Sequence, residues 1–222
     1  MRRALVVAAA LAAAAVAAAP AGATNECRGL KVCVPVVGPW VVAGGAAQVS
    51  FQLSCPAKFV VAGLDAELSR AGVDVTFRGS LGSPVNPGIT TSRSAEFLAR
   101  LLAGATPATF RPHIGCVPAT GGGQRFPTVH RTVRPGRPLA ANAVQLAVTP
   151  GVHHFVERCT AGKRLVAATH AVGFYSAAPP SPALVGSVAV RQTVQAGIVH
   201  LVVRAGPLPG ARAIVQVDLE CA

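Results

Sequence analysis

Six cysteines are the residues whose type and spacing bear most directly on the chemistry of this 222-residue chain. Four of them bracket two stretches of almost equal length, one from Cys55 to Cys116 and one from Cys159 to Cys221. Cysteines in an exported chain pair as disulfides, and no CxxC motif suggests zinc binding instead. The matched spacing predicts the bridges Cys55–Cys116 and Cys159–Cys221, which leaves Cys27–Cys33 as a small local loop.

Histidine and glutamate come together in one short segment, His153-His154-Phe155-Val156-Glu157. On a helix, His153 and Glu157 would face the same way and could bind a metal ion. On a strand they would share a face but lie about 13 Å apart, which is too far for one ion. We expect a strand, so the sequence predicts no metal site and no cofactor.

Carboxylates occur in two closely spaced pairs, Asp65 with Glu67 and Asp218 with Glu220. On a strand each pair would share a face about 7 Å apart, a spacing compatible with the two carboxylates of a glycosidase. Such pairs are more often exposed surface, so no catalytic residue is predicted. Nucleophilic catalysis has no local G-x-S-x-G motif. The side chains that folding could still bring together for it are Ser80, Ser92, Ser176, His113 and His170.

The segment from Ser80 to Ser94 is distinctive because it is rich in Gly, Pro, Ser, Thr and Asn and contains one arginine. Its counterpart Ala177–Pro182 lacks an arginine. A loop that differs between two copies of a scaffold is a place where binding can arise. We interpret it as a candidate site for an anionic or sugar ligand, with a plain turn-rich connection as the alternative. The candidate residues are Asn86, Thr90, Thr91 and Arg93.

The two stretches bracketed by cysteines read as diverged copies of each other. Cys55-Pro-Ala-Lys-Phe-Val-Val-Ala aligns with Cys159-Thr-Ala-Gly-Lys-Arg-Leu-Val-Ala. The closing segment Phe110-Arg-Pro-His-Ile-Gly-Cys aligns with Val215-Gln-Val-Asp-Leu-Glu-Cys. Length differences fall in expected loops, as in a true repeat. Chance similarity in a chain rich in Ala and Val is the alternative.

Strict alternation of apolar and polar residues predicts strands at 49–55 and 215–221. In the strand 110–116 the same pattern turns His113 outward, and Pro112 suggests an edge strand or a bulge. Residues 94–103 contain good helix formers. Their counterpart 198–204 is dense in β-branched residues, so we predict strands in both copies.

The strand that precedes Cys159 is less regular than its counterpart. Counting back from this cysteine places His153 and Glu157 on the face that should be apolar. A bulge or a one-residue slip between Val156 and Cys159 would restore the pattern.

Residues 1–23 read as a secretory signal peptide, with Arg2 and Arg3 before an apolar stretch and small residues at the cleavage site. The mature chain would begin near Thr24 and be secreted or held in the cell envelope, without a later transmembrane segment. The formal charge of +12 would become 12 − 2 = +10, which attracts a protein to anionic surfaces. Nucleic acid is not expected, because the basic residues are not interleaved with aromatic ones.

The chain therefore divides into a signal peptide (1–23), a first disulfide-closed β domain with an N-terminal extension (24–118), a linker (119–142) and a second disulfide-closed β domain (143–222). The linker is rich in Pro, Gly and Arg and has no acidic residue. The segment Val34–Val42 is expected to add a strand to the first domain. The predicted fold class is all-β, with two tandem antiparallel β-sandwich or barrel-like domains related by an internal repeat.

The pattern of cysteine, small and basic residues and Val-Val-Ala at 55–63 and 159–168 resembles a module common in exported actinobacterial proteins. Residues 61–118 are also similar to an uncharacterised secreted family from those bacteria, through Gly63-Leu-Asp-Ala-Glu67, residues 82–94 and residues 110–116. The resemblance implies tandem disulfide-closed β modules outside the cytoplasm. It brings no activity with it.

We expect an exported, non-enzymatic protein of the cell envelope or medium, with a binding or structural role. The alternative is an extracellular hydrolase with a site between the two β domains, which convergent Ser, His and acidic side chains in a cleft would favour. The expected partner is an anionic cell-envelope polymer or glycan, bound beside Arg93 or by the arginines of the linker. The oligomeric state is not predicted.

Overall fold

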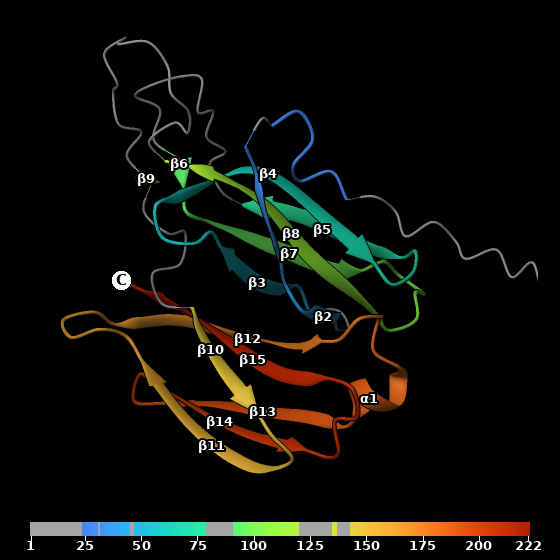
Figure 1. Cartoon of the computed structure of the whole chain (residues 1–222). Coiled ribbons are helices and arrows are strands. Elements are labelled where there is room, and N and C mark those ends of the chain that lie inside the picture. The colour runs from blue at the N-terminus through green and yellow to red at the C-terminus, as the bar shows by residue number, and fades with distance from the viewer. Residues whose placement is uncertain (1–23, 31, 45–46, 79–90, 120–134, 137–142) are drawn as a thin grey trace, which may run out of the picture.

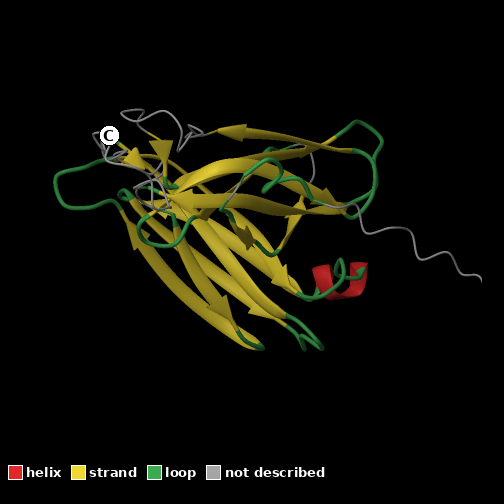
Figure 2. Ribbon diagram, turned by 45° about the horizontal axis from the view of Figure 1, so that its top comes forward, coloured by secondary structure: helices red, strands yellow, loops and turns green. Residues whose placement is uncertain are grey.

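The computed structural model describes residues 24–30, 32–44, 47–78, 91–119, 135–136 and 143–222. These residues form curled antiparallel sheets with almost no helix, which confirms the all-β fold class (Figure 1). In the described part of the chain the one helix is α1 (Pro182–Gly186), which Figure 2 shows beside the ends of the strands. We call residues 24–118 the first half and residues 143–222 the second half.

The largest sheet runs through both halves. Its strands are β1 (Val34–Val37), β2 (Trp40–Ala43), β4 (Phe59–Leu68), β8 (Ala108–Pro118), β10 (Val144–Val148), β12 (Leu165–Tyr175) and β15 (Arg212–Cys221). The connection is β2, which pairs with β8 of the first half and with β12 of the second. The segment Val34–Val42 was expected to add a strand to the first half, and it does so through β1 and β2; in addition, β2 joins the two halves.

A smaller three-stranded sheet completes each half. In the first half β3 (Val49–Ser54), β7 (Ser94–Leu101) and β5 (Val73–Arg78) lie in that order. In the second half the order is β11 (Gly151–Arg158), β14 (Ile198–Ala205) and β13 (Val188–Gln195). The strands predicted at 94–103 and 198–204 are therefore confirmed as β7 and β14. A short parallel pair, β6 (Thr91–Ser92) with β9 (Pro135–Gly136), brings two linker residues beside the candidate loop.

The strands around Cys55 and Cys159 pair in the same way. In the first half, β7 lies between β5 and β3, and β3 ends just before Cys55. In the second half, β14 lies between β13 and β11, and β11 ends just before Cys159. In the large sheet β4 pairs with β8 as β12 pairs with β15. Strands β1 and β10 also have equivalent places, because β1 pairs with β8 and β10 pairs with β15.

The structure contains the three disulfides Cys27–Cys33, Cys55–Cys116 and Cys159–Cys221. This matches the pairing expected from the spacing. Each of the two longer bridges joins the end of the first small-sheet strand to β8 or β15 of the large sheet, so each ties the two layers of its half together.

Apolar side chains form two main clusters, one in each half. The first is built around Phe51, Phe97 and Phe110 and also contains Ala171 and Ile214 of the second half. The second is built around Phe174 and strands β14 and β15, and Val42 of β2 packs against it. The halves therefore share core packing as well as a sheet.

Pro112 does not lie on an edge strand, so of its two predicted alternatives, an edge strand or a bulge, the first was wrong. Its strand β8 is interior, with β4 on one side and β1 followed by β2 on the other. The N–H of Gly38 donates to the carbonyl of Pro112 at 2.8 Å, at the junction between β1 and β2. The ladder is already interrupted there, so the missing N–H of proline leaves no unpaired partner.

The bulge or slip expected before Cys159 is also absent. Strand β11 pairs with β14 without a register shift from Gly151 to Arg158. His153 and Glu157 therefore do lie on the inner side, opposite the buried Val203 and Val199. Both are half-buried, and β11 is an edge strand of its sheet.

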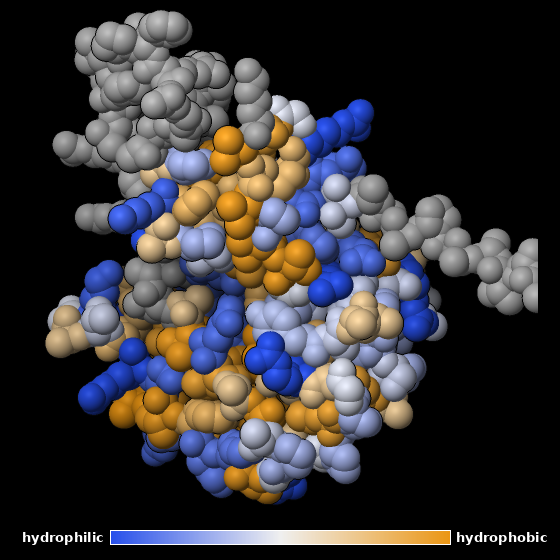
Figure 3. Space-filling model, viewed as in Figure 1, coloured by the Kyte–Doolittle hydropathy of each residue, from blue (hydrophilic) through white to orange (hydrophobic). Residues whose placement is uncertain are grey.

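The surface carries hydrophilic and hydrophobic residues intermixed over the face seen in Figure 3. No helix within the described ranges has the length and apolar character needed to cross a bilayer.

Candidate functional site

The candidate loop around Arg93 is only partly described. Asn86 and Thr90 lie outside the described residues, and for Thr91 only the backbone is placed, in β6. Arg93 follows β6, and its carbonyl accepts the N–H of Cys55 at 2.8 Å. Its Nε is buried and has no hydrogen-bond partner among the described residues. The structure thus anchors the Arg93 backbone beside the Cys55–Cys116 bridge, and the four-residue site stays a prediction because Asn86 and Thr90 lie outside the described residues.

A groove of about 190 Å³ lies between the two halves, where the outer face of β3 and β7 meets β12 and β15. The first half contributes Ser50, Glu96 and Arg78, and the second contributes Asp218 and Glu220. Asp218 and Glu220 are one of the carboxylate pairs that the sequence analysis interpreted as exposed surface. The groove exists because the polar face of one half packs against the polar face of the other.

Charge in this groove is predominantly negative. The Ser50 hydroxyl donates to Glu96 at 2.5 Å, and the Arg78 guanidinium lies 3.9 Å from the same carboxylate at the exposed rim. Burial raises the pKa of Asp218 above its ordinary value of 3.8, and the Glu96 charge adds to this rise. A hydrogen bond with Ser50 partly opposes it, and the Glu220 charge again raises it.

Beside the groove, one glutamine side chain joins the halves through buried hydrogen bonds. The Oε1 of Gln216 accepts the backbone N–H of Gln52 at 2.5 Å, and its Nε2 donates to the carbonyl of Gln52 at 2.9 Å. Both residues are almost completely buried. Strand β3 is an edge strand of its sheet, so this amide satisfies backbone groups that would otherwise be unpaired.

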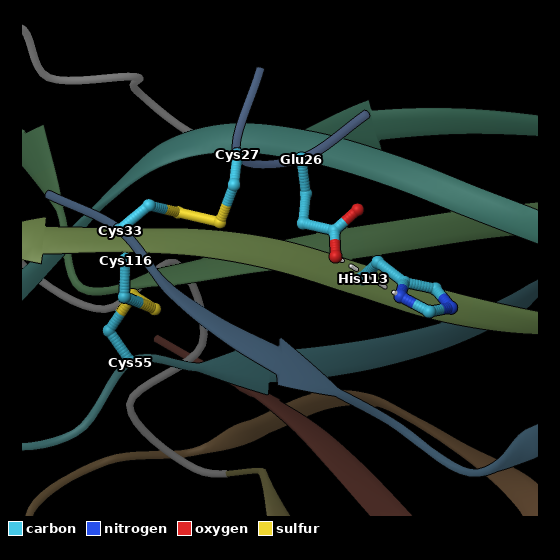
Figure 4. Close-up of a disulfide and its surroundings, with 6 residues drawn as sticks. All are labelled: Glu26, Cys27, Cys33, Cys55, His113 and Cys116. Carbon is cyan, nitrogen blue, oxygen red and sulfur yellow. Dashed lines mark ion pairs between the residues drawn. A yellow bond between two sulfur atoms is a disulfide. The ribbon is translucent and has the colours of Figure 1, made fainter. Parts of the chain in front are cut away.

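A second polar cluster lies under the N-terminal segment, on the outer face of β4 and β8 (Figure 4). The His113 imidazole is buried between two carboxylates, with Nδ1 at 3.6 Å from Glu26 and Nε2 at 3.7 Å from Glu67. His113 does face outward from its strand as predicted, yet it is 5% exposed because residues 24–33 cover it. The backbone N–H of Asn25 also donates to Asp65 at 2.6 Å.

Two glycines allow the N-terminal segment to approach this closely. A side-chain carbon at Gly63 or Gly115 would overlap with the Glu26 carbonyl. The two glycines are partners across β4 and β8. The Cys27–Cys33 bridge closes the covering segment into a loop (Figure 4), and a side-chain carbon at Gly115 would lie 3.0 Å from the Cys33 Sγ. Glu26 was missed from the sequence, because nothing in its neighbourhood marks it as buried.

The chemistry considered for the other candidate residues is not assembled in the described residues. No group of three or more His, Cys, Asp or Glu side chains that could hold a metal ion occurs among them. His153 binds the carbonyl of Thr149 at 2.7 Å instead. His170 contacts the Gln192 side chain at 2.8 Å, and Ser176 donates to the carbonyl of Ala178. Ser80 lies outside the described residues.

Comparison with known proteins gives no family for this chain. No protein-family model, no curated protein and no solved structure matches it.

Proposed function

We propose that this chain is an exported, non-enzymatic protein of the cell envelope or the extracellular medium, with a binding or structural role. Three disulfides in the described part of the chain point to an oxidising, extracellular environment. The signal peptide at residues 1–23 and the resemblance to secreted actinobacterial proteins are further support from the sequence.

We also propose that the two halves are tandem β-sandwich domains that arose by duplication. The support is the equivalent strand pairing on either side of the linker, together with one long disulfide at the same place in each half. Chance similarity of sequence would not bring equivalent pairing with it.

The observation that carries a binding or structural role is the fusion of the halves into one unit. Strand β2 belongs to both, Ala171 and Ile214 of the second half enter the first core, and the Gln216 amide bonds to Gln52. Domains joined only by a linker move relative to each other by default. A continuous sheet and a shared core hold the outer surfaces of the two halves at a fixed distance, as a scaffold for binding requires.

The test is to incubate the oxidised mature protein with an isolated cell-envelope fraction and with a panel of glycan and ester substrates. We expect co-sedimentation with the envelope and no turnover. Turnover that is abolished by a substitution in the groove would contradict the proposal.

One observation favours the alternative, a hydrolase with its site between the halves. The groove holds Glu96, Asp218 and Glu220 together, and the pKa of Asp218 is raised. A carboxyl group with a raised pKa beside a second carboxyl group is the pair that glycoside hydrolysis uses. Asp218→Asn and Glu96→Gln should each abolish glycoside turnover if this alternative holds, whereas Glu157→Gln, outside the groove, should not.

A further inference from the structure

The outer face of the sheet β11–β14–β13 is an open surface at the end of the molecule away from the first half (Figure 1). Val199, Leu201 and Val203 of β14 are buried and mark the inner face. The residues that alternate with them therefore face outward, and the register fixes their neighbours on β11 and β13.

Five of the twelve outward positions carry arginine or histidine, and none carries a carboxylate. His154 and Arg191 lie on either side of Val202, one on each edge strand. The three arginines and His154 are exposed, and His200 is half-buried. We call these five residues the cationic face: His154, Arg158, Arg191, His200 and Arg204.

The remaining positions of this face are small, aliphatic or uncharged polar residues. Val152 and Val156 are 58% and 59% exposed. These uncharged residues lie between the members of the cationic face and carry no negative charge that would neutralise it. Within the described residues, no carboxylate forms an ion pair with a member of the cationic face.

The equivalent surface of the first half, on β3–β7–β5, differs in charge and in access. Its arginines are paired, Arg78 with Glu96 at 3.9 Å and Arg100 with Asp74 at 3.0 Å. Strands β12 and β15 of the second half contact it through β3. In the second half this surface is therefore open and positively charged. In the first half its charges are paired and the second half partly covers it.

We propose that the cationic face binds a polyanionic glycan, a carbohydrate polymer that carries carboxylate or phosphate groups; this rests on the proposed binding role. Guanidinium groups match carboxylate and phosphate with paired hydrogen bonds. Alternate residues of a strand are about 7 Å apart and neighbouring strands about 5 Å apart, so the cations form a flat array that an extended polymer can follow.

The composition of the face favours a glycan over the other polyanions. It has no Phe, Tyr or Trp among its outward positions. Stacking on bases and anchoring at a membrane interface both depend on aromatic side chains. A charged glycan needs only the array of cations and the uncharged residues between them.

The experiment uses the oxidised mature protein and immobilised sodium polygalacturonate, with neutral dextran as the control polymer. We expect retention on polygalacturonate alone, weakening as salt is raised. The triple variant Arg158→Gln/Arg191→Gln/Arg204→Gln should bind about tenfold more weakly or worse. The triple variant Arg28→Gln/Arg70→Gln/Arg164→Gln loses the same formal charge at exposed positions elsewhere and should retain most of the affinity.

Both triple variants are compared by thermal unfolding, and Arg191→Gln alone serves as a milder change if the first variant is unstable. Equal loss in both triple variants, or no retention of the wild type, would overturn the proposal. So would tighter binding to phosphatidylglycerol vesicles or to single-stranded DNA than to polygalacturonate. Envelope association that survives substitution of the three arginines would overturn the cationic face as the site while leaving the proposed function standing.

Discussion

At Asp218 the folded state disfavours the ionised form of the carboxyl group. It lies in the groove between the halves, where burial and the Glu96 charge raise its pKa above 3.8. The folded chain then binds a proton more readily than the unfolded chain does. By linkage, the free energy of unfolding falls as pH rises from the ordinary value of an aspartate to the raised value of the folded state.

Asp218→Asn removes this unfavourable ionised form and keeps a side chain of the same size that can hydrogen-bond with Ser50. We expect a higher melting temperature than that of the wild type at neutral pH, with the difference shrinking as the solution is acidified. Thermal unfolding at a series of pH values measures this. Glu220→Gln on the same strand is the control and should have a smaller effect, because Glu220 is exposed. A lower melting temperature for Asp218→Asn at neutral pH would contradict the account.

Gln216 gives the second prediction for a single residue. Gln216→Ala leaves the buried N–H and carbonyl of Gln52 without their partners. Each buried unpaired group costs about 1–3 kcal/mol, so the free energy of unfolding should fall by about that amount or more. Denaturant unfolding provides the measurement. Gln195→Ala, at an exposed position of β13, should leave stability unchanged, and an equally small effect at Gln216 would show that the halves are not joined there.

At the scale of elements, the N-terminal segment shows how glycine positions determine what covers a sheet. The described residues of this segment, 24–30 and 32–33, lie across β4 and β8 only because Gly63 and Gly115 have no side chain beneath the Glu26 carbonyl. The same contact buries the His113 imidazole between Glu26 and Glu67.

Gly115→Ala should therefore displace the segment. Overpacking of this kind costs about 1–3 kcal/mol. We expect faster hydrogen exchange and easier proteolysis within residues 24–33. Gly186→Ala is the matched control, since a side-chain carbon there would meet nothing within 4 Å. Unchanged protection of residues 24–33 in Gly115→Ala would show that the segment does not pack on these strands.

Strands with a strict local pattern could be predicted from the sequence. Alternation at 49–55 and 215–221 gave β3 and β15, and comparison of the copies gave β7 as a strand despite its helix formers. The location of Pro112 could not be predicted, because it depends on a break between β1 and β2 that lies far away in sequence. The burial of the polar residues Ser50 and Gln52 could not be predicted either, because it depends on the second half, which covers them.

The whole molecule is held by links of different range. Cross-links that close about 60 residues stabilise by roughly 4 kcal/mol in the chain-entropy model, and a loop of about six residues by roughly 2 kcal/mol. The long bridges Cys55–Cys116 and Cys159–Cys221 each act within one half. Strand β2 and the Gln216 amide act between the halves.

The candidate loop at Arg93 was predicted from local composition. The groove and the cationic face could not be predicted in this way, because both depend on how the sheets are placed.

The most direct measurement is peptide mapping of the protein under non-reducing conditions, after export in an oxidising compartment. The account of two equivalent units, each closed by its own bridge, predicts three linked peptide pairs: Cys27 with Cys33, Cys55 with Cys116, and Cys159 with Cys221. A bridge between a cysteine of the first half and one of the second would contradict it.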